Sequence, residues 1–203
     1  MRAQLYAGAF AAISTLSSDA RSLLSSNTSS FSLYDPKNGP MLAFVLGNHL
    51  SDYFSLQAEY VWNRNSLTFT SSTFSSGSRA EYQESRSSFQ HSVFGDVLVY
   101  FRNRKSRLRP YLSVGAGVVH LSSSKQQVSQ LLGAPELPPL KFVSNVFALR
   151  VPVGMDVNLG NGWALRYTFS ETLSENPISD RLSPPGQHSL KNFENLFGVV
   201  KQF

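Results

Sequence analysis

Apolar and polar residues alternate most regularly between residues 147 and 159, where every odd position is apolar. The even positions between them include Arg150 and Asp156. Because successive side chains of a strand point to opposite faces, this period predicts a two-faced β-strand. The alternation resumes over residues 163–169, after the tight turn signal Gly160-Asn161-Gly162. The first strand is about as long as a bilayer crossing, and the pair predicts a transmembrane hairpin.

The same period, interrupted by turn residues, predicts eight strands along the chain. They are expected at about 3–14, 40–49, 53–64, 90–101, 110–121, 145–159, 163–172 and 190–203. The connectors alternate between long (15–39, 65–89, 122–144 and 173–189) and short (50–52, 102–109 and 160–162). Outer-membrane barrels show this rhythm, with short periplasmic turns and long extracellular loops. We therefore expect an all-β fold: a closed antiparallel eight-stranded transmembrane up-and-down β-barrel, forming one domain over residues 1–203.

The long connectors are rich in Ser and Pro and lack apolar periodicity. Such segments are usually solvated and mobile. Shortening 71–80 is therefore expected to leave the fold intact. We expect charge on the lipid face to be costly, as in Val153→Arg, and Gly154→Ser on the lumenal face to be tolerated better.

Composition narrows the class of protein without deciding it. The chain has 203 residues, of which 41% are hydrophobic, and a mean hydropathy of -0.16. No apolar run approaches the roughly 18 residues of a membrane helix, which excludes a helical membrane protein. A soluble lipocalin-like barrel with its apolar face inward is the alternative. Aromatic residues at strand ends favour the membrane, where they form interfacial girdles; these are Trp62, Phe101, Trp163 and Phe203.

The first 16 residues allow two interpretations. Arg2 and the apolar run that follows it resemble a short secretory signal. Alternatively, Leu5, Ala7, Ala9 and later odd positions form one face of a first strand, which gives the even strand number that a barrel needs.

Charge and metal-binding residues indicate no cofactor. The chain has no cysteine and four histidines, none of them at a metal-ligand spacing in sequence, so no metal site is expected. Five of the cations that give the net charge of +5 lie between Arg102 and Arg109. This is a local basic turn, solvated or in contact with lipid headgroups, and it predicts no nucleic-acid partner.

Three segments resemble the small outer-membrane barrels typified by the membrane domain of outer-membrane protein A: residues 109–117, residues 153–167 and the closing strand 196–203. The resemblance implies an outer-membrane location in a diderm bacterium, contact with outer-membrane lipids and a monomeric state. A closing strand that ends in Phe203 resembles the signal recognised by the barrel-assembly machinery, although Lys201 stands where the family pattern has an apolar residue. The family's motifs specify a barrel and no activity.

The polar face of the strands predicts a plugged lumen, because an eight-stranded barrel has room for packed side chains and none for a wide channel. Counting back from a three-residue loop at 160–162 places Asp156 opposite Arg166 and Leu159 opposite Trp163, so an ion pair is expected. The charges assigned to the lumen are Glu59, Asp96, Arg150, Asp156, Arg166 and Glu194.

These features favour a structural or surface-interaction protein that is not an enzyme, with any specificity in the long loops. One alternative is a narrow ion channel through the lumenal charges. The other is a hydrolase that modifies lipid A on the lipid face, with His120 and Ser122 as the catalytic pair and Glu136 in the next loop. Lipid A deacylases carry such a pair on the penultimate strand, where this chain has Thr168-Phe169-Ser170 and no histidine.

Overall fold

The computed structural model describes residues 4–133, 140–176, 184–185 and 188–203, and the regular structure in these ranges is entirely β. None of these residues forms a helix of the length and apolarity needed to cross a membrane. The strands are β1 (Gln4–Leu16), β2 (Asp19–Leu24), β3 (Thr28–Pro36), β4 (Gly39–His49), β5 (Phe54–Ser75), β6 (Ser78–Tyr100), β7 (Leu108–Leu132), β8 (Lys141–Gly160), β9 (Trp163–Glu175) and β10 (Ser189–Gln202).

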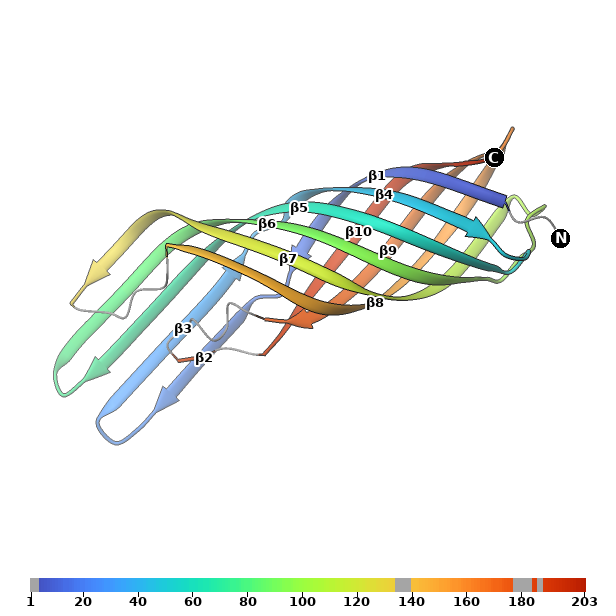
Figure 1. The fold of residues 1–203 in the computed structure, drawn as a ribbon. Helices are drawn as coiled ribbons and strands as arrows, with labels where there is room; N and C mark the ends of the chain where they lie inside the picture. Colours follow the sequence, from blue (N-terminus) through green and yellow to red (C-terminus); the bar gives the residue numbers. More distant parts are fainter. Residues whose placement is uncertain (1–3, 134–139, 177–183, 186–187) are drawn as a thin grey trace.

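Eight of the strands described form a closed antiparallel ring in the order β1-β4-β5-β6-β7-β8-β9-β10. The ring closes where β1 pairs with β10, from Tyr6 opposite Gln202 to Leu16 opposite Asn192. The predicted eight-stranded up-and-down barrel is therefore confirmed. Because β1 also pairs with β4, the first-strand interpretation of residues 4–16 is correct. Both termini lie at the end that carries the short turns, called here the turn end (Figure 1).

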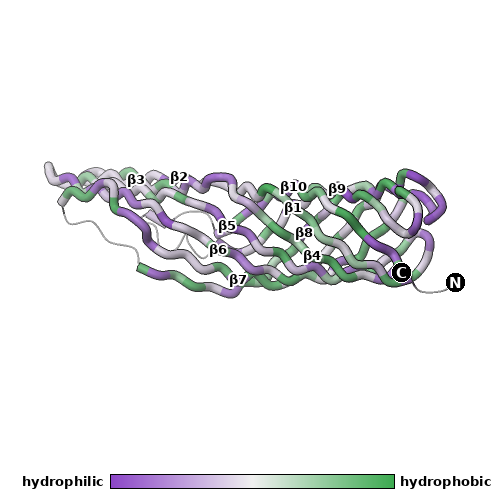
Figure 2. The backbone as a smooth tube through the Cα atoms, turned by 90° about the horizontal axis from the view of Figure 1, so that it is seen from above, coloured by the Kyte–Doolittle hydropathy of each residue, from purple (hydrophilic) through white to green (hydrophobic). Residues whose placement is uncertain are grey.

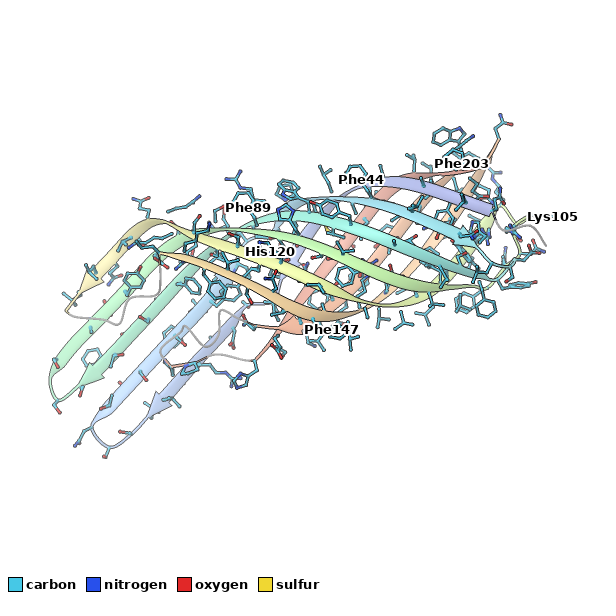
Figure 3. The ribbon with its side chains drawn as sticks, in the orientation of Figure 1. Phe44, Phe89, Lys105, His120, Phe147 and Phe203 are labelled. Atoms are coloured by element: carbon cyan, nitrogen blue, oxygen red, sulfur yellow. The ribbon has the colours of Figure 1, made fainter. Side chains whose placement is uncertain are left out.

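The barrel is apolar outside and polar inside. Phe44 on β4 and Phe147 on β8 point away from the barrel and are more than half exposed (Figure 3). The inward positions beside them hold buried polar and charged side chains, such as Glu59 and Asp96. A protein folded in water would place these two sets the other way round, so the lipocalin-like alternative is wrong.

The predicted connectors 15–39 and 65–89 are largely strand, which corrects the expectation of mobile loops. β5 and β6 pair without interruption until Ser75 lies opposite Ser78. Ser76 and Gly77 form the turn with φ of 46° and 86°, the positive values that a two-residue hairpin turn requires. Between residues 64 and 89 both faces of the hairpin carry many Ser and Thr, so the apolar period disappears although the backbone stays extended.

The β2–β3 hairpin adds two strands to this sheet. β3 pairs with the outer part of β5 from Thr28 opposite Ser75 to Pro36 opposite Leu67. We call β2, β3 and residues 64–75, 78–90 and 122–132 of the longer strands the extension. It projects from the barrel opposite the termini and is much more hydrophilic than the barrel strands (Figures 1 and 2).

An apolar core joins the extension to the end of the barrel. The side chains of Tyr34 on β3, Leu67 and Phe69 on β5 and Leu121 on β7 are buried against one another, together with Leu16 and Leu190 from the ends of β1 and β10. This cluster follows the polar layers of the lumen along the barrel axis. Its packing therefore stabilises β3, β5 and β7 as strands beyond the bilayer.

One expectation about the lumen is wrong. A side chain at Gly154 would place its Cβ within 2.5 Å of the Tyr111 ring and closer still to the Tyr167 carbonyl oxygen. A Cβ atom does not come this close to atoms that it is not bonded to, so Gly154→Ser cannot be accommodated without moving β9. The sequence could not show this, because Tyr111 lies on the neighbouring strand β7.

We predict that the same charge costs much more stability at one outward position than at another. Val153→Arg lies in the apolar band and should lower the free energy of unfolding by about 2–4 kcal/mol. Ser66→Arg lies on the outward face of the extension, in water, and should change it by less than about 0.5 kcal/mol. Urea unfolding of both variants in lipid vesicles measures the difference. Equal losses would contradict the assigned depth.

Candidate functional site: the lumenal charges and an outward histidine pair

Asp156 on β8 and Arg166 on β9 lie directly opposite each other, in the register predicted from the sequence. The turn differs from the prediction: Gly160, not Leu159, pairs with Trp163, and Leu159 is a bulge. The bulge at Leu159 and the two-residue turn together leave three residues unpaired, as the predicted three-residue loop does. The pairing from Asn158 opposite Ala164 onward is therefore the same.

All three nitrogens of the Arg166 guanidinium donate hydrogen bonds. Its Nε donates to Asp156 Oδ1 at 2.6 Å and its Nη2 to Asp156 Oδ2 at 2.8 Å. Nη1 donates to Gln57 Oε1 at 2.8 Å, and Nη2 also donates to the Tyr100 hydroxyl oxygen at 2.7 Å. Both charged side chains are buried, so this two-point contact satisfies groups that have no water to bind.

A second charged layer surrounds Arg150 on β8. Its Nε donates to Asp96 Oδ1 at 2.7 Å, and its Nη2 bonds Glu59 Oε2 at 2.8 Å and the second Asp96 oxygen. The guanidinium also lies over the Phe94 ring, 4.2 Å from its centroid. These three charges come from β5, β6 and β8 and therefore tie non-neighbouring strands together across the lumen.

Glu194 on β10 is the third carboxylate of this layer. Asn192 donates to its Oε1 at 3.0 Å, whereas Oε2 is buried without a hydrogen-bond partner. The charged groups that act on it are Arg150, Glu59 and Asp96. Three carboxylates thus share one guanidinium, and Glu194 is the one that the guanidinium does not contact through a hydrogen bond.

The basic turn is less solvated than the sequence suggested. Arg104 donates to Asp52 Oδ1 at 3.0 Å and to Gln4 Oε1 at 3.2 Å, which ties the turn to two other segments. Arg109 is buried at the start of β7, with its guanidinium 3.9 Å from the centroid of the Tyr100 ring. Lys105 remains at the tip of the turn end (Figure 3).

Sequence reasoning missed a charged pair inside the extension. Arg86 and Glu84 on β6 are buried and bonded at 2.6 Å, and Tyr82 donates its hydroxyl proton to the other Glu84 oxygen. Burial, reinforced by the Glu84 carboxylate, raises the pKa of the Tyr82 hydroxyl. All three residues lie in the stretch assigned to a mobile connector, which is why they were not considered as inward-facing.

The four aromatic residues expected at the membrane interfaces lie on the outward face. Phe101, Trp163 and Phe203 are substantially exposed at the turn end, whereas Trp62 lies where β5 enters the extension. The Lys201 ammonium lies 4.9 Å from the Trp163 ring centroid and donates to the Asn161 carbonyl at 2.7 Å. A cation beside a half-wet indole is typical of an interface position.

His120 lies on the outward face where the barrel meets the extension (Figure 3). Its Nδ1 is bonded at 2.7 Å to Asn145 Oδ1 on β8, and the structure therefore gives it a partner other than Ser122. Glu136 lies outside the described residues. The nearest ring is that of His91 on β6, 6.4 Å away between centroids, which the sequence analysis did not single out.

A family model matches nearly the whole chain. Residues 3–200 match the model of the outer membrane protein beta-barrel domain. The chain belongs to this outer-membrane barrel family. It is an outer-membrane protein, and the location expected from its sequence is confirmed. No curated protein matches it in sequence.

Solved structures of small outer-membrane barrels share the fold. Neisserial surface protein A is 16% identical, with a TM-score of 0.59 and complete coverage of both chains. Ail, the attachment invasion locus protein of Yersinia pestis, is 10% identical, with a TM-score of 0.51 and coverage of 98% of this chain and 99% of Ail. AlkL is 15% identical, with a TM-score of 0.51 and coverage of 98% and 90%. At these identities the likeness shows the fold alone.

We predict strong coupling between Asp156 and Arg166. Asp156→Asn or Arg166→Met alone should lower the free energy of unfolding by about 3–5 kcal/mol, because each leaves a buried charge unpaired. The double variant should lose much less than the sum. A double-mutant cycle measured by urea unfolding in vesicles tests this, and additive losses would show that the lumen is wet at this layer.

Two glutamates of the Arg150 layer should differ in what their loss does to stability. Glu59→Gln weakens a charged hydrogen bond to Arg150 and should lower the free energy of unfolding by about 1.5–3 kcal/mol. Glu194→Gln has the same shape change but removes a buried charge that lacks such a contact, so stability should stay equal or rise by about 1 kcal/mol. Unfolding both in the same vesicles makes each the control for the other. A loss at Glu194 as large as at Glu59 would contradict the assignment.

Proposed function

We propose that this protein is a surface-interaction protein, in which the barrel is the anchor and the extension is the part that contacts a macromolecular partner outside the cell. The extension is the single observation that carries the proposal. β5, β6 and β7 have 22, 23 and 25 residues, about twice what a bilayer crossing needs. The residues beyond the bilayer are held by the apolar core that joins the extension to the barrel and by the added strands β2 and β3, as a preformed binding surface requires.

The far end of the extension supplies apolar contact area. Large apolar side chains are exposed there in a region surrounded by Ser and Thr; they are Leu23, Leu24, Phe74, Leu131 and Leu132. Exposed apolar groups at the tip of a water-facing sheet are a common feature of protein contact sites. β2 adds an open edge, since in the described residues its one pairing is with β3, and such an edge can accept a strand from a partner.

The two alternatives are less well supported. The ion pairs of the Asp156 and Arg150 layers and the apolar cluster of the extension fill successive levels of the barrel, which disfavours an ion path. In the described residues His120 is hydrogen-bonded to Asn145 and not to Ser122, so the geometry gives no direct support to a Ser122 nucleophile activated by His120. Among the similar folds, Ail was solved in complex with the heparin analogue sucrose octasulfate, a ligand of a surface protein of this shape.

The test shortens the β5–β6 hairpin at the far end of the extension, which removes Phe74, without touching the barrel. Replacing residues 72–81 with an Asn-Gly turn joins Ser71 to Tyr82, which already face each other in the ladder. The barrel should keep its heat-modifiable mobility on gels, because its closed ladder lies below the cut. Binding of the nanodisc-embedded chain to immobilised extracellular-matrix proteins, serum proteins and heparin should be weakened.

A second variant, Leu24→Ser with Leu131→Ser, keeps the backbone and should weaken the same binding at least ~10-fold through lost apolar contact. Stepwise conductance of the wild-type chain in planar bilayers, or loss of acyl chains from lipid A in its presence, would favour the channel or the hydrolase instead. Unchanged binding by both tip variants would refute the role of the extension.

A further inference from the structure

His91 and His120 face each other on the outward surface of two adjacent strands. β6 and β7 pair them directly, so their Cβ atoms start only about 4.5–5.5 Å apart. Their ring centroids lie 6.4 Å apart at an interplanar angle of 52°. The two rings are close enough for one metal ion, bound about 2.0–2.1 Å from a nitrogen of each, to lie between them.

Both rings have their Nδ1 atoms occupied. His120 Nδ1 is 2.7 Å from Asn145 Oδ1, an atom that can only accept, so Nδ1 carries the proton and the Nε2 lone pair is free. His91 Nδ1 is 2.7 Å from the Tyr60 hydroxyl. In metal sites, the non-ligating nitrogen of a histidine is held in this way by an oxygen partner, which fixes the ring and its tautomer.

From this geometry we propose that His91 and His120 form a two-histidine site for a divalent transition-metal ion of the zinc or copper type. Imidazole nitrogens suit these ions, whereas calcium and magnesium prefer oxygen. The site is different in kind from a closed structural metal centre: among the described residues no three His, Cys, Asp or Glu side chains are placed so that they could hold a metal ion together. Water or lipid phosphate oxygens complete the coordination.

The position of the pair supports an accessible, reversible site. His91 is exposed and His120 half-buried, so a cation bound there keeps much of its hydration. Trp62 lies directly opposite His91 on β5, at the level where the outward face changes from apolar to hydrophilic. The site therefore faces the lipid headgroups, beside the base of the extension.

The test is a calorimetric titration of the untagged full chain in detergent micelles with zinc chloride at pH 7.5. We expect one zinc ion per chain, with His91→Asn and His120→Asn each weakening the affinity at least ~10-fold. His188→Asn is the matched control and should bind as the wild type. Zinc affinity should be weaker at lower pH, because protons compete with the metal for the imidazole nitrogens.

Asn145 serves as a positioning residue with its own readout. Asn145→Ala should weaken zinc binding ~10-fold and Asn145→Asp should restore it, since a carboxylate accepts the same Nδ1 proton. All variants change outward side chains, and heat-modifiable gel mobility checks that each barrel is folded. Equal zinc affinity of the wild type and His91→Asn with His120→Asn combined would overturn the proposal. Equally tight binding of magnesium would do so as well, because it would indicate an oxygen site.

Discussion

The closed ring of hydrogen-bonded strands is the constraint on which the rest of this structure depends. Backbone amides in the hydrocarbon of a bilayer have no water to bind, so every strand needs a partner on both sides. The pairing of β1 with β10 meets this condition for the last two edges. Once the ring is closed, alternate side chains must face lipid or lumen, and the polar ones can only be placed inside.

Polar groups placed inside the barrel need partners in the lumen, because they are removed from water there. Eight strands leave a lumen that side chains fill, so a charge there is stable only beside an opposite charge or a hydrogen-bond partner. Arg166 and Arg150 meet this condition through contacts to Asp156 on β8 and to Asp96 and Glu59 on β6 and β5. The same contacts fix the register of the strands, because a slip by one residue would move every charge to the lipid face.

The sequence was sufficient to predict the barrel because its strands carry a physical contrast between lipid and lumen. Asp156 lies opposite Arg166 as predicted, although the predicted turn was wrong. The bulge at Leu159 adds the residue by which the turn is shorter than the predicted loop. The contrast ends where the membrane ends. From residue 64 to residue 89 the two faces of the strands contact water or a small core, so Ser and Thr occur on both. The sequence of these strands therefore lacks the apolar period and resembles that of a loop.

Contacts between strands were beyond sequence reasoning for a different reason. Gly154 is constrained by the Tyr111 ring and His120 lies opposite His91, and in both cases the partner comes from another strand at a level set by the register. Spacing along the chain carries no information about such neighbours until the pairing of the strands is known. A histidine pair that looks scattered in the sequence can therefore form one site in the sheet, and surface sites of barrels are best sought along rows across the strands.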